Sequence, residues 1–212
     1  MSNTDVKQTN PRGLETLSEH IEQQARLPTG NVSGRSLPPV DKWQPEVEAD
    51  MDLLIKANGE WWHEGDQITR QSLVDLFSTV LWREGTDEAP EYFLKTPVEK
   101  LRIQVEDVPF LITQVNEVEQ QGVEYLQFIT STGDVVYLTE DNPLEMRLYQ
   151  QQVNKDSQDY RPYIEVRFGM RALISRNVLM HLVRLGELSE HQGETRLTLT
   201  SGGKQFTLAV PS

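Results

Sequence analysis

Two short stretches place an arginine after a hydroxyl residue where a helix is expected to begin. They are Thr69-Arg70 and Ser175-Arg176, each preceded by an isoleucine and followed by leucines at helical spacing. A helix start presents unpaired N–H groups and the positive end of the helix dipole, and an arginine binds a phosphate or carboxylate through two N–H groups. The two stretches therefore predict a binding site for a small anionic ligand, such as a nucleotide.

Aromatic side chains lie close to both stretches in the sequence, namely Trp61, Trp62 and Phe168. Their flat faces are suited to stacking against the ring of a ligand. We therefore include the three aromatic residues in the predicted ligand site.

A simpler interpretation of the same residues stays open. Thr69 and Ser175 would then only cap their helices, each contributing about 1 kcal/mol, with Gln67 as a second candidate for the first cap. The two arginines would pair with neighbouring carboxylates such as Glu64 and Glu187.

The composition limits the classes of partner. The net charge of −13 repels phosphate backbones and anionic lipids, and no basic patch offsets it, so we expect neither a nucleic acid nor a membrane partner. A protein partner stays possible. No stretch approaches the roughly 20 apolar residues of a membrane span, and we expect a soluble cytoplasmic protein.

The residue types also limit the chemistry. The absence of cysteine excludes disulfides and thiol catalysis. His20, His63, His181 and His191 are scattered without the spacing of a helical zinc site, so we expect no metal, and no cofactor is indicated. His181, one helical turn after Asn177, is a second-rank site candidate. Since no nucleophile motif is present and no catalytic residue can be named, the sequence favours a non-enzymatic role.

Three regions are expected along the chain. Residues 1–39 are polar and rich in glycine and proline, which predicts a mobile N-terminal arm. Residues 40–97 are expected to form an N-terminal α+β subdomain, and residues 98–212 a C-terminal β-rich subdomain with one helix.

Local patterns predict the elements within these regions. Asn58-Gly59 between apolar runs predicts a hairpin, and an apolar stripe that reaches Leu81 predicts a helix ended near Gly85. Alternating apolar residues over 98–138 predict an antiparallel meander, and Ser201-Gly202-Gly203 predicts a closing hairpin.

The two arginine stretches also stand at similar places in a longer pattern. In each, an apolar strand ends near a glycine, a helix begins at the hydroxyl residue and arginine, and a strand follows. The expected fold class is therefore α+β, with duplicated strand-helix-strand units and an antiparallel meander.

Five segments resemble one bacterial family, catalogued as domain of unknown function 1285. They are Pro39-Val40-Asp41-Lys42-Trp43, Phe77-Ser78-Thr79-Val80-Leu81, Leu94-Lys95-Thr96-Pro97-Val98-Glu99-Lys100, Val105-Glu106-Asp107-Val108-Pro109-Phe110 and Arg161-Pro162-Tyr163-Ile164. The resemblance implies a duplicated α+β architecture and a C-terminal half superficially like a pleckstrin-homology barrel. It also implies a nucleotide-like ligand between the halves and a role in signalling.

The family's strongest motif contains Lys95, Thr96, Glu99 and Lys100. These are second-rank site candidates, since a motif that only forms a tight strand bend would look the same.

Two functions from different classes follow. The first is a ligand-binding module that holds a small anionic or nucleotide-like ligand between two repeated halves, which requires Arg70 and Arg176 to converge. The alternative is a peptide-interaction or protein-interaction module that uses a groove or sheet edge of the C-terminal half. An enzyme would need a histidine or paired carboxylates within hydrogen-bond reach in a cleft.

Overall fold

The structure, a computed structural model, is mostly β with two α-helices among the residues it describes. It describes residues 14, 18–19, 21–22, 31–32, 35–149, 159–191 and 193–210. Most of the expected N-terminal arm, residues 1–39, lies outside the described residues, although Ile21 and Leu37 are buried.

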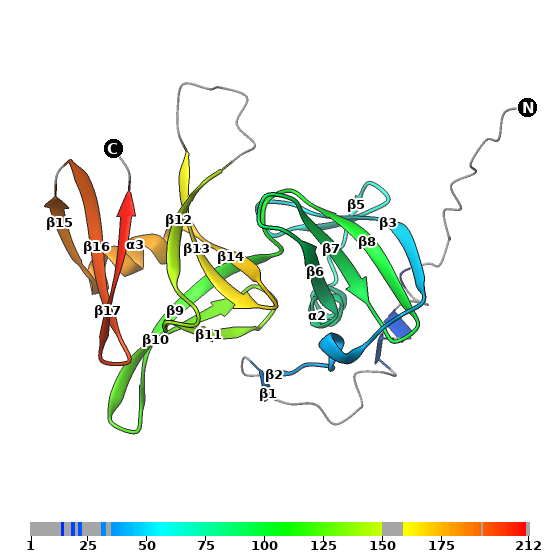
Figure 1. Cartoon of the computed structure of the whole chain (residues 1–212), viewed down its shortest axis with the longest axis horizontal. Helices are drawn as coiled ribbons and strands as arrows, with labels where there is room; N and C mark the ends of the chain where they lie inside the picture. Colours follow the sequence, from blue (N-terminus) through cyan, green and yellow to red (C-terminus); the bar gives the residue numbers. More distant parts are fainter. Residues whose placement is uncertain are drawn as a thin grey trace, which may run out of the picture. The chain divides into compact units, whose positions relative to one another are not determined.

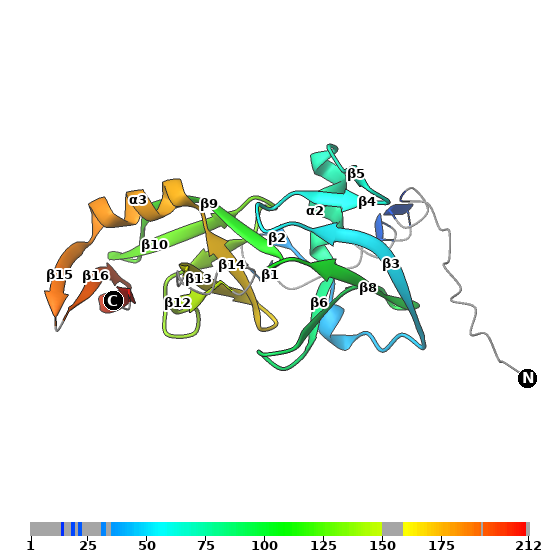
Figure 2. The same cartoon turned by 90° about the horizontal axis from the view of Figure 1, so that it is seen from above.

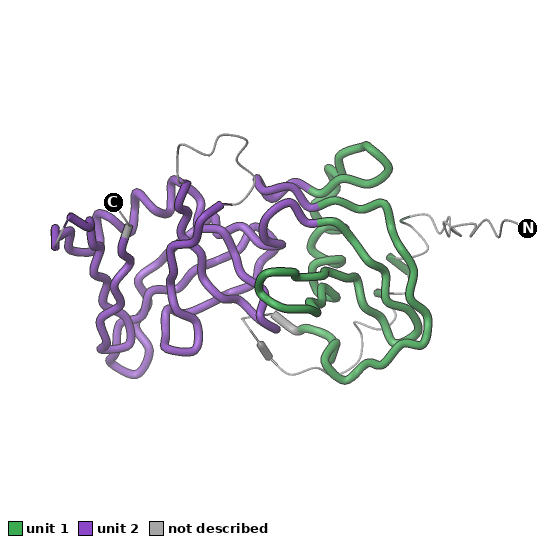
Figure 3. The backbone as a smooth tube through the Cα atoms, turned by 45° about the horizontal axis from the view of Figure 1, so that its top comes forward, with its two compact units in different colours: residues 1–30, 36–54, 61–104 green, residues 31–35, 55–60, 105–212 purple. Residues whose placement is uncertain are grey.

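The chain divides into two compact units (Figure 3). Unit 1 comprises residues 1–30, 36–54 and 61–104, and unit 2 comprises residues 31–35, 55–60 and 105–212. The expected boundary after Pro97 is therefore wrong. The strand at 99–105 stays in the first sheet because it pairs with the strand before it.

Unit 1 is built on a six-stranded sheet that curls around a helix (Figure 1). Its strand order is β5-β4-β3-β8-β7-β6. The elements are η1 (Val40–Lys42), β3 (Val47–Ile55), β4 (Trp61–His63), β5 (Asp66–Gln67), α2 (Gln71–Thr79), β6 (Leu81–Gly85), β7 (Pro90–Lys95) and β8 (Glu99–Val105). The predicted turn at Asn58-Gly59 is confirmed, with Gly59 at a φ of 85° that favours glycine.

Helix α2 is shorter than the apolar stripe predicts. It buries Val74, Phe77 and Ser78 and ends at Thr79. Leu81 belongs to β6 and pairs with Leu94 of β7. The apolar stripe continues because both segments face the same core, so sheet pairing ends the helix where side-chain periodicity alone would extend it.

Unit 2 contains a second six-stranded sheet, in the order β11-β10-β9-β14-β13-β12. Its strands are β9 (Phe110–Gln120), β10 (Val123–Thr130), β11 (Val135–Tyr137), β12 (Leu144–Leu148), β13 (Tyr160–Arg167) and β14 (Met170–Ile174). The predicted meander over 98–138 is confirmed from β9 to β11 but wrong at its start, because β8 pairs in unit 1. Instead β14 lies beside β9 in parallel, a pairing that the sequence did not indicate.

A helix and a three-stranded sheet complete unit 2. Helix α3 (Arg176–Leu185) packs along β9 (Figure 2) and leads into β15 (Glu187–His191), β16 (Glu194–Ser201) and β17 (Lys204–Val210). The predicted closing hairpin is confirmed between β16 and β17, where Gly202 and Gly203 both have positive φ. Two further short strands are β1 (Asn31–Val32) and β2 (Arg35–Ser36).

The order of elements supports two similar halves. In each, a hairpin precedes the helix, and three antiparallel strands follow it: β6, β7 and β8 after α2, and β15, β16 and β17 after α3. The fold is therefore α+β. The halves differ in where their last strands pair, since β8 lies next to β3 whereas β15 to β17 form a separate sheet.

A buried ion pair lies at one end of the larger sheet of unit 2. Arg167 Nε donates to Asp134 Oδ1 at 3.0 Å, and the two side chains are 2% and 0% exposed. Asp134 also accepts from the Thr132 hydroxyl, while its N–H donates to the Thr130 hydroxyl. The Arg167 guanidinium lies 5.0 Å from the centre of the Phe110 ring. These contacts join the β10–β11 turn to the ends of β13 and β9.

Replacing one member of this pair should strongly destabilise unit 2. Arg167→Met leaves the Asp134 carboxylate buried without its cation, which costs about 3–5 kcal/mol. Hydrogen exchange of the β9 and β10 amides measures the loss. Arg147→Met, which removes an exposed pair with Glu145, should cost less than about 1 kcal/mol, and equal effects of the two variants would contradict the assignment.

Candidate functional site

The two predicted helix starts are built differently. Ser175 is the N-cap of α3 as predicted, and Arg176 is its first residue. In α2 the prediction of Thr69 or Gln67 as N-cap is wrong, since Arg70 takes that position. Neither N-cap residue forms a side-chain capping hydrogen bond.

The two arginines belong to different units, Arg70 to unit 1 and Arg176 to unit 2. Arg70 is exposed, and its Nε donates to the Ser72 hydroxyl at 3.2 Å. Arg176 is exposed as well. Neither makes an ion pair with Glu64 or Glu187 in the described part of the chain, so the predicted surface pairing is not present there.

Helix α3 exposes a basic face. Its sequence contains no acidic residue, and Arg176, His181 and Arg184 are all exposed, with Met180 between them at 51% exposure. His181 therefore lies on the surface of α3. In a chain with a net charge of −13, this face is a local region of positive charge.

The predicted stacking residues differ in their accessibility. Trp61 is only 2% exposed and belongs to the core. Trp62 is half-buried in β4. Phe168 is half-buried at a φ of 53° in the β13–β14 turn, and its ring lies 5.8 Å from the Arg167 guanidinium.

The motif around Thr96 forms a tight bend between β7 and β8. The Thr96 hydroxyl accepts from the N–H of Glu99 at 3.1 Å and donates to its carbonyl at the same distance. Thr96 is 2% exposed and Glu99 is 4% exposed. Their contacts support the structural interpretation of these second-rank candidates.

Lys95 and Lys100, the other second-rank candidates, are held by their neighbours. Lys95 lies 4.0 Å from the Trp82 ring, and burial lowers its pKa. Lys100 donates to Glu84 at 2.8 Å and pairs with Glu48 at 3.0 Å. Burial opposes its charge, but these two hydrogen bonds outweigh it and raise the pKa of Lys100. Lys100 therefore joins neighbouring strands of unit 1 through its carboxylate partners, whereas Lys95 is held against Trp82 at some cost to its charge.

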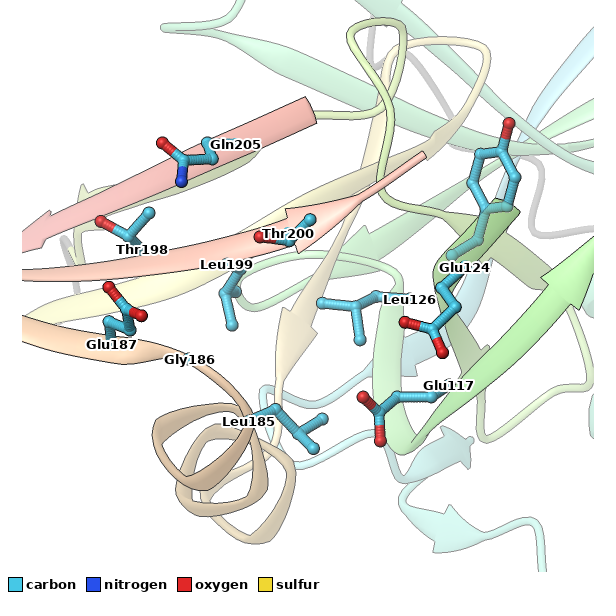
Figure 4. A pocket seen from close by; sticks show the side chains of 11 residues that line it. Glu117, Glu124, Leu126, Leu185, Gly186, Glu187, Thr198, Leu199, Thr200 and Gln205 are labelled. Atoms are coloured by element: carbon cyan, nitrogen blue, oxygen red, sulfur yellow. The ribbon is translucent and has the colours of Figure 1, made fainter. Parts of the chain in front are cut away.

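A pocket of about 270 Å³ lies within unit 2 (Figure 4). One wall is the β9–β10 hairpin, another is the end of α3 with the start of β15, and the third is the β16–β17 hairpin. The lining residues are Glu117, Glu124, Tyr125, Leu126, Leu185, Gly186, Glu187, Thr198, Leu199, Thr200 and Gln205. Leucines from three elements form its apolar part.

The charged residues that line this pocket are all acidic. Glu117, Glu124 and Glu187 line it, and no lining residue is basic. None of the three makes an ion pair within the described ranges. Glu119 lies directly opposite Glu124 in the hairpin, so a fourth carboxylate is on the same face. Like charges placed opposite each other destabilise a hairpin unless a cation lies between them.

The C-terminus of α3 borders the pocket, and its last turn also carries the exposed Arg184. Leu185 and Gly186, at the end of this helix, line the pocket. The last carbonyl groups of a helix carry the negative end of its dipole and favour a cation. The site is therefore suited to a positive group, the opposite of the anionic ligand expected from the sequence.

No group of three or more His, Asp or Glu among the described residues is placed to hold a metal ion. No helix found there is long and apolar enough to span a membrane.

Both halves of the chain match one family. Residues 38–108 match "Domain of unknown function (DUF1285), N-terminal domain", and residues 109–208 match "Protein of unknown function (DUF1285), C-terminal domain". The chain belongs to the DUF1285 family. This confirms the resemblance predicted from its sequence.

Solved structures of DUF1285 proteins are similar to this chain. One from Silicibacter pomeroyi DSS-3 has a TM-score of 0.70 and 31% identity, covering 92% of this chain and 93% of that chain. Another, from Shewanella baltica OS155, has a TM-score of 0.45 and 28% identity, covering 63% of this chain and 91% of that chain. The comparison with curated proteins found no match.

A second polar cluster of this DUF1285 protein lies beside the junction of its two family domains. The Tyr163 hydroxyl donates to both oxygens of Asp107, at 3.1 and 2.9 Å. Arg161 binds Asp159 through Nε and Nη2, at 3.0 and 2.8 Å, and its guanidinium lies 3.4 Å from the Tyr149 ring. Sequence reasoning did not select these residues, although Asp107, Arg161 and Tyr163 fall in the family segments.

Burial raises the pKa of Asp107 above its ordinary value of 3.8, although the Tyr163 hydrogen bond and Arg161 act against the shift. The folded protein therefore keeps this proton to a higher pH than the unfolded chain does. Stability from this group is present at low pH and is lost as the pH rises from the ordinary pKa through the raised one.

Asp107→Asn should remove this pH dependence while keeping an acceptor for Tyr163. We expect the stability of the variant, relative to the parent, to improve as the pH rises from about 4 to about 7. Urea unfolding over this range measures it. Tyr163→Phe should strengthen the dependence, because the hydrogen bond from Tyr163 holds the pKa of Asp107 down and its loss lets burial raise that pKa further. A difference between Asp107→Asn and the parent that is constant with pH would contradict the prediction.

Proposed function

We propose that this protein is a non-enzymatic binding module whose pocket in unit 2 receives a positively charged group of a protein partner. The observation that carries the proposal is the set of pocket carboxylates, Glu117, Glu124 and Glu187, which no cation of the described residues neutralises. The proposal takes up the protein-interaction alternative of the sequence analysis and assigns it to this pocket.

The size and lining of the pocket support a lysine or arginine side chain. A volume of about 270 Å³ is at the lower limit for drug-sized ligands and suits a single long side chain. Leu126, Leu185 and Leu199 can cover the aliphatic stem, while the carboxylates at the rim bind the charged end. The net charge of −13 also accelerates the approach of a basic partner.

Removing two pocket charges should weaken the binding of a small cation. We expect Glu117→Gln combined with Glu124→Gln to weaken spermidine binding by at least about tenfold at low salt, since each carboxylate contributes about 1 kcal/mol at contact distance in water. NMR titration at the Leu126, Leu185 and Gly186 amides measures the change. Raising the salt concentration should weaken binding to the parent protein.

A matched variant separates the pocket from overall charge. Glu88→Gln with Asp141→Asn removes the same number of charges at exposed positions outside the pocket. It should bind spermidine nearly as tightly as the parent. Equal weakening in both double variants would show that net charge alone attracts the cation, and would overturn the proposal.

A second candidate function retains the anionic ligand. The basic face of α3, with exposed Arg176, His181 and Arg184 and no acidic residue in the helix, supports it. In this case a phosphate group would bind at the α3 face of unit 2, with a nucleotide as the ligand predicted from the sequence.

The anionic ligand is tested by thermal stability. If ATP binds at α3, it raises the melting temperature of the parent, since a ligand specific for the native state stabilises it. Arg176→Gln with Arg184→Gln should abolish this increase. Lys42→Gln with Arg147→Gln, which removes the same charge elsewhere, should preserve it. An unchanged melting temperature of the parent at saturating ATP would exclude this function.

The finer features expected from the family belong to the same proposal. A curled sheet with one helix packed along β9 supports a C-terminal half superficially like a pleckstrin-homology barrel. A binding module of this kind would act in cytoplasmic signalling by recruiting its partner.

A further inference from the structure

Strand β15 is the outer strand of the small sheet of unit 2. The strand order is β15-β16-β17, so one edge of β15 has no strand partner among the described residues. All five of its residues, Glu187–His191, are exposed. An unpaired edge presents a row of N–H and C=O groups that can pair with another chain.

This edge lacks most of the features that usually prevent pairing, and its protecting charges, Glu187 and Glu190, repel an acidic chain but attract a basic one. The five residues include no proline, lysine or arginine, and their register with β16 runs from Glu187↔Thr198 to His191↔Glu194 without a bulge. Leu188 is 56% exposed. A strand of this length presents an edge of about 17 Å, long enough to bind an extended segment.

The edge is continuous with the acidic pocket. Gly186 and Glu187, which lead into and begin β15, also line the pocket. A segment paired along β15 would therefore pass the pocket, with its side chains alternating between the two faces of the sheet. Glu187 and Glu190 give the edge itself a negative charge.

We propose that an extended, basic segment of another protein adds to the edge of β15 as a fourth strand and places a lysine or arginine in the adjacent pocket. The inference rests on the proposed function, since it takes the pocket as the site of the positive group. Backbone hydrogen bonds would supply affinity independent of sequence, and the pocket would select the basic side chain.

Charge favours this occupant over a second copy of the chain. Each copy carries a net charge of −13, so two copies repel each other at long range. Antiparallel self-pairing centred on Ser189 would also place the exposed Leu188 of each copy opposite Glu190 of the other. A basic segment instead meets complementary charge along the whole edge.

The test uses a seven-residue peptide that alternates valine and lysine, with blocked ends, on the full chain. Its matched control carries methyl groups on the three central backbone nitrogens, which removes hydrogen-bond donors but keeps every charge. We expect the unmodified peptide to bind at least about tenfold more tightly than the methylated control and to slow hydrogen exchange of the β15 amides. Equal binding of both peptides, or no binding of either, would overturn the added strand.

Protein variants distinguish this inference from the proposed function. Glu190→Lys reverses a charge on the edge outside the pocket. It should weaken binding of the unmodified peptide by at least about tenfold, while spermidine binding changes little. Asp141→Lys, with the same charge change away from the edge, should bind the peptide more tightly than Glu190→Lys does. If spermidine binds but the peptides behave alike, the pocket function stands and the added strand fails.

Sedimentation velocity tests whether a second copy of the chain occupies the β15 edge instead. The inference expects the free chain not to associate through β15. If the parent forms a dimer whose stability changes in Glu190→Lys, a second copy of the chain covers the edge, and the binding of a basic segment there is overturned.

Discussion

The architecture of unit 2 depends on one buried ion pair. Arg167 and Asp134 are removed from water almost completely, and charges in that position are tolerated only when they are paired and hydrogen-bonded. The Thr130 and Thr132 hydroxyls complete the shell around the carboxylate. Because the two charges come from β13 and from the β10–β11 turn, strands distant in sequence must meet in one register. The pair holds the β10–β11 turn against the end of β13 within the larger sheet, whose β9–β10 hairpin borders the same pocket as the end of α3.

The two units differ in whether their surface charges are paired. In unit 1, Lys100 and Arg102 pair with Glu48, Glu84 and Glu91 across neighbouring strands, so the polar face of the sheet is neutralised internally. In unit 2, carboxylates gather around the pocket without cations from the lining. Internal pairing neutralises a surface, whereas unpaired charge of one sign attracts and selects a partner of the other sign. The difference supports a structural role for the lysine motif of unit 1 and a binding role for unit 2.

Much of the fold could be predicted from local chemistry. Alternation of Phe110, Ile112 and Val115 indicated a strand, and Gly202-Gly203 indicated a turn, because both signals act over a few residues. The end of α2 at Thr79 could not be found in this way, since pairing of Leu81 with a distant strand decides it. The candidate site in unit 2 was harder to predict from the sequence than the fold. Glu117, Glu119 and Glu124 have the spacing of one hairpin face, but their meaning depends on α3 and β16, which lie far away in the sequence.

The parallel pairing of β14 with β9 affects the order in which the chain can acquire structure. Ala172 pairs with Phe110, roughly 60 residues earlier, whereas every strand of the unit 1 sheet has been made once residue 105 is complete. During synthesis the sheet of unit 1 can therefore form before β14 has been made and can pair with β9. Contacts of such long sequence separation form slowly because the loop must be closed before the pairing stabilises it. The newly made β9–β10 hairpin consequently passes through a period with an exposed edge, which the glutamates on its surface protect from aggregation through their mutual repulsion.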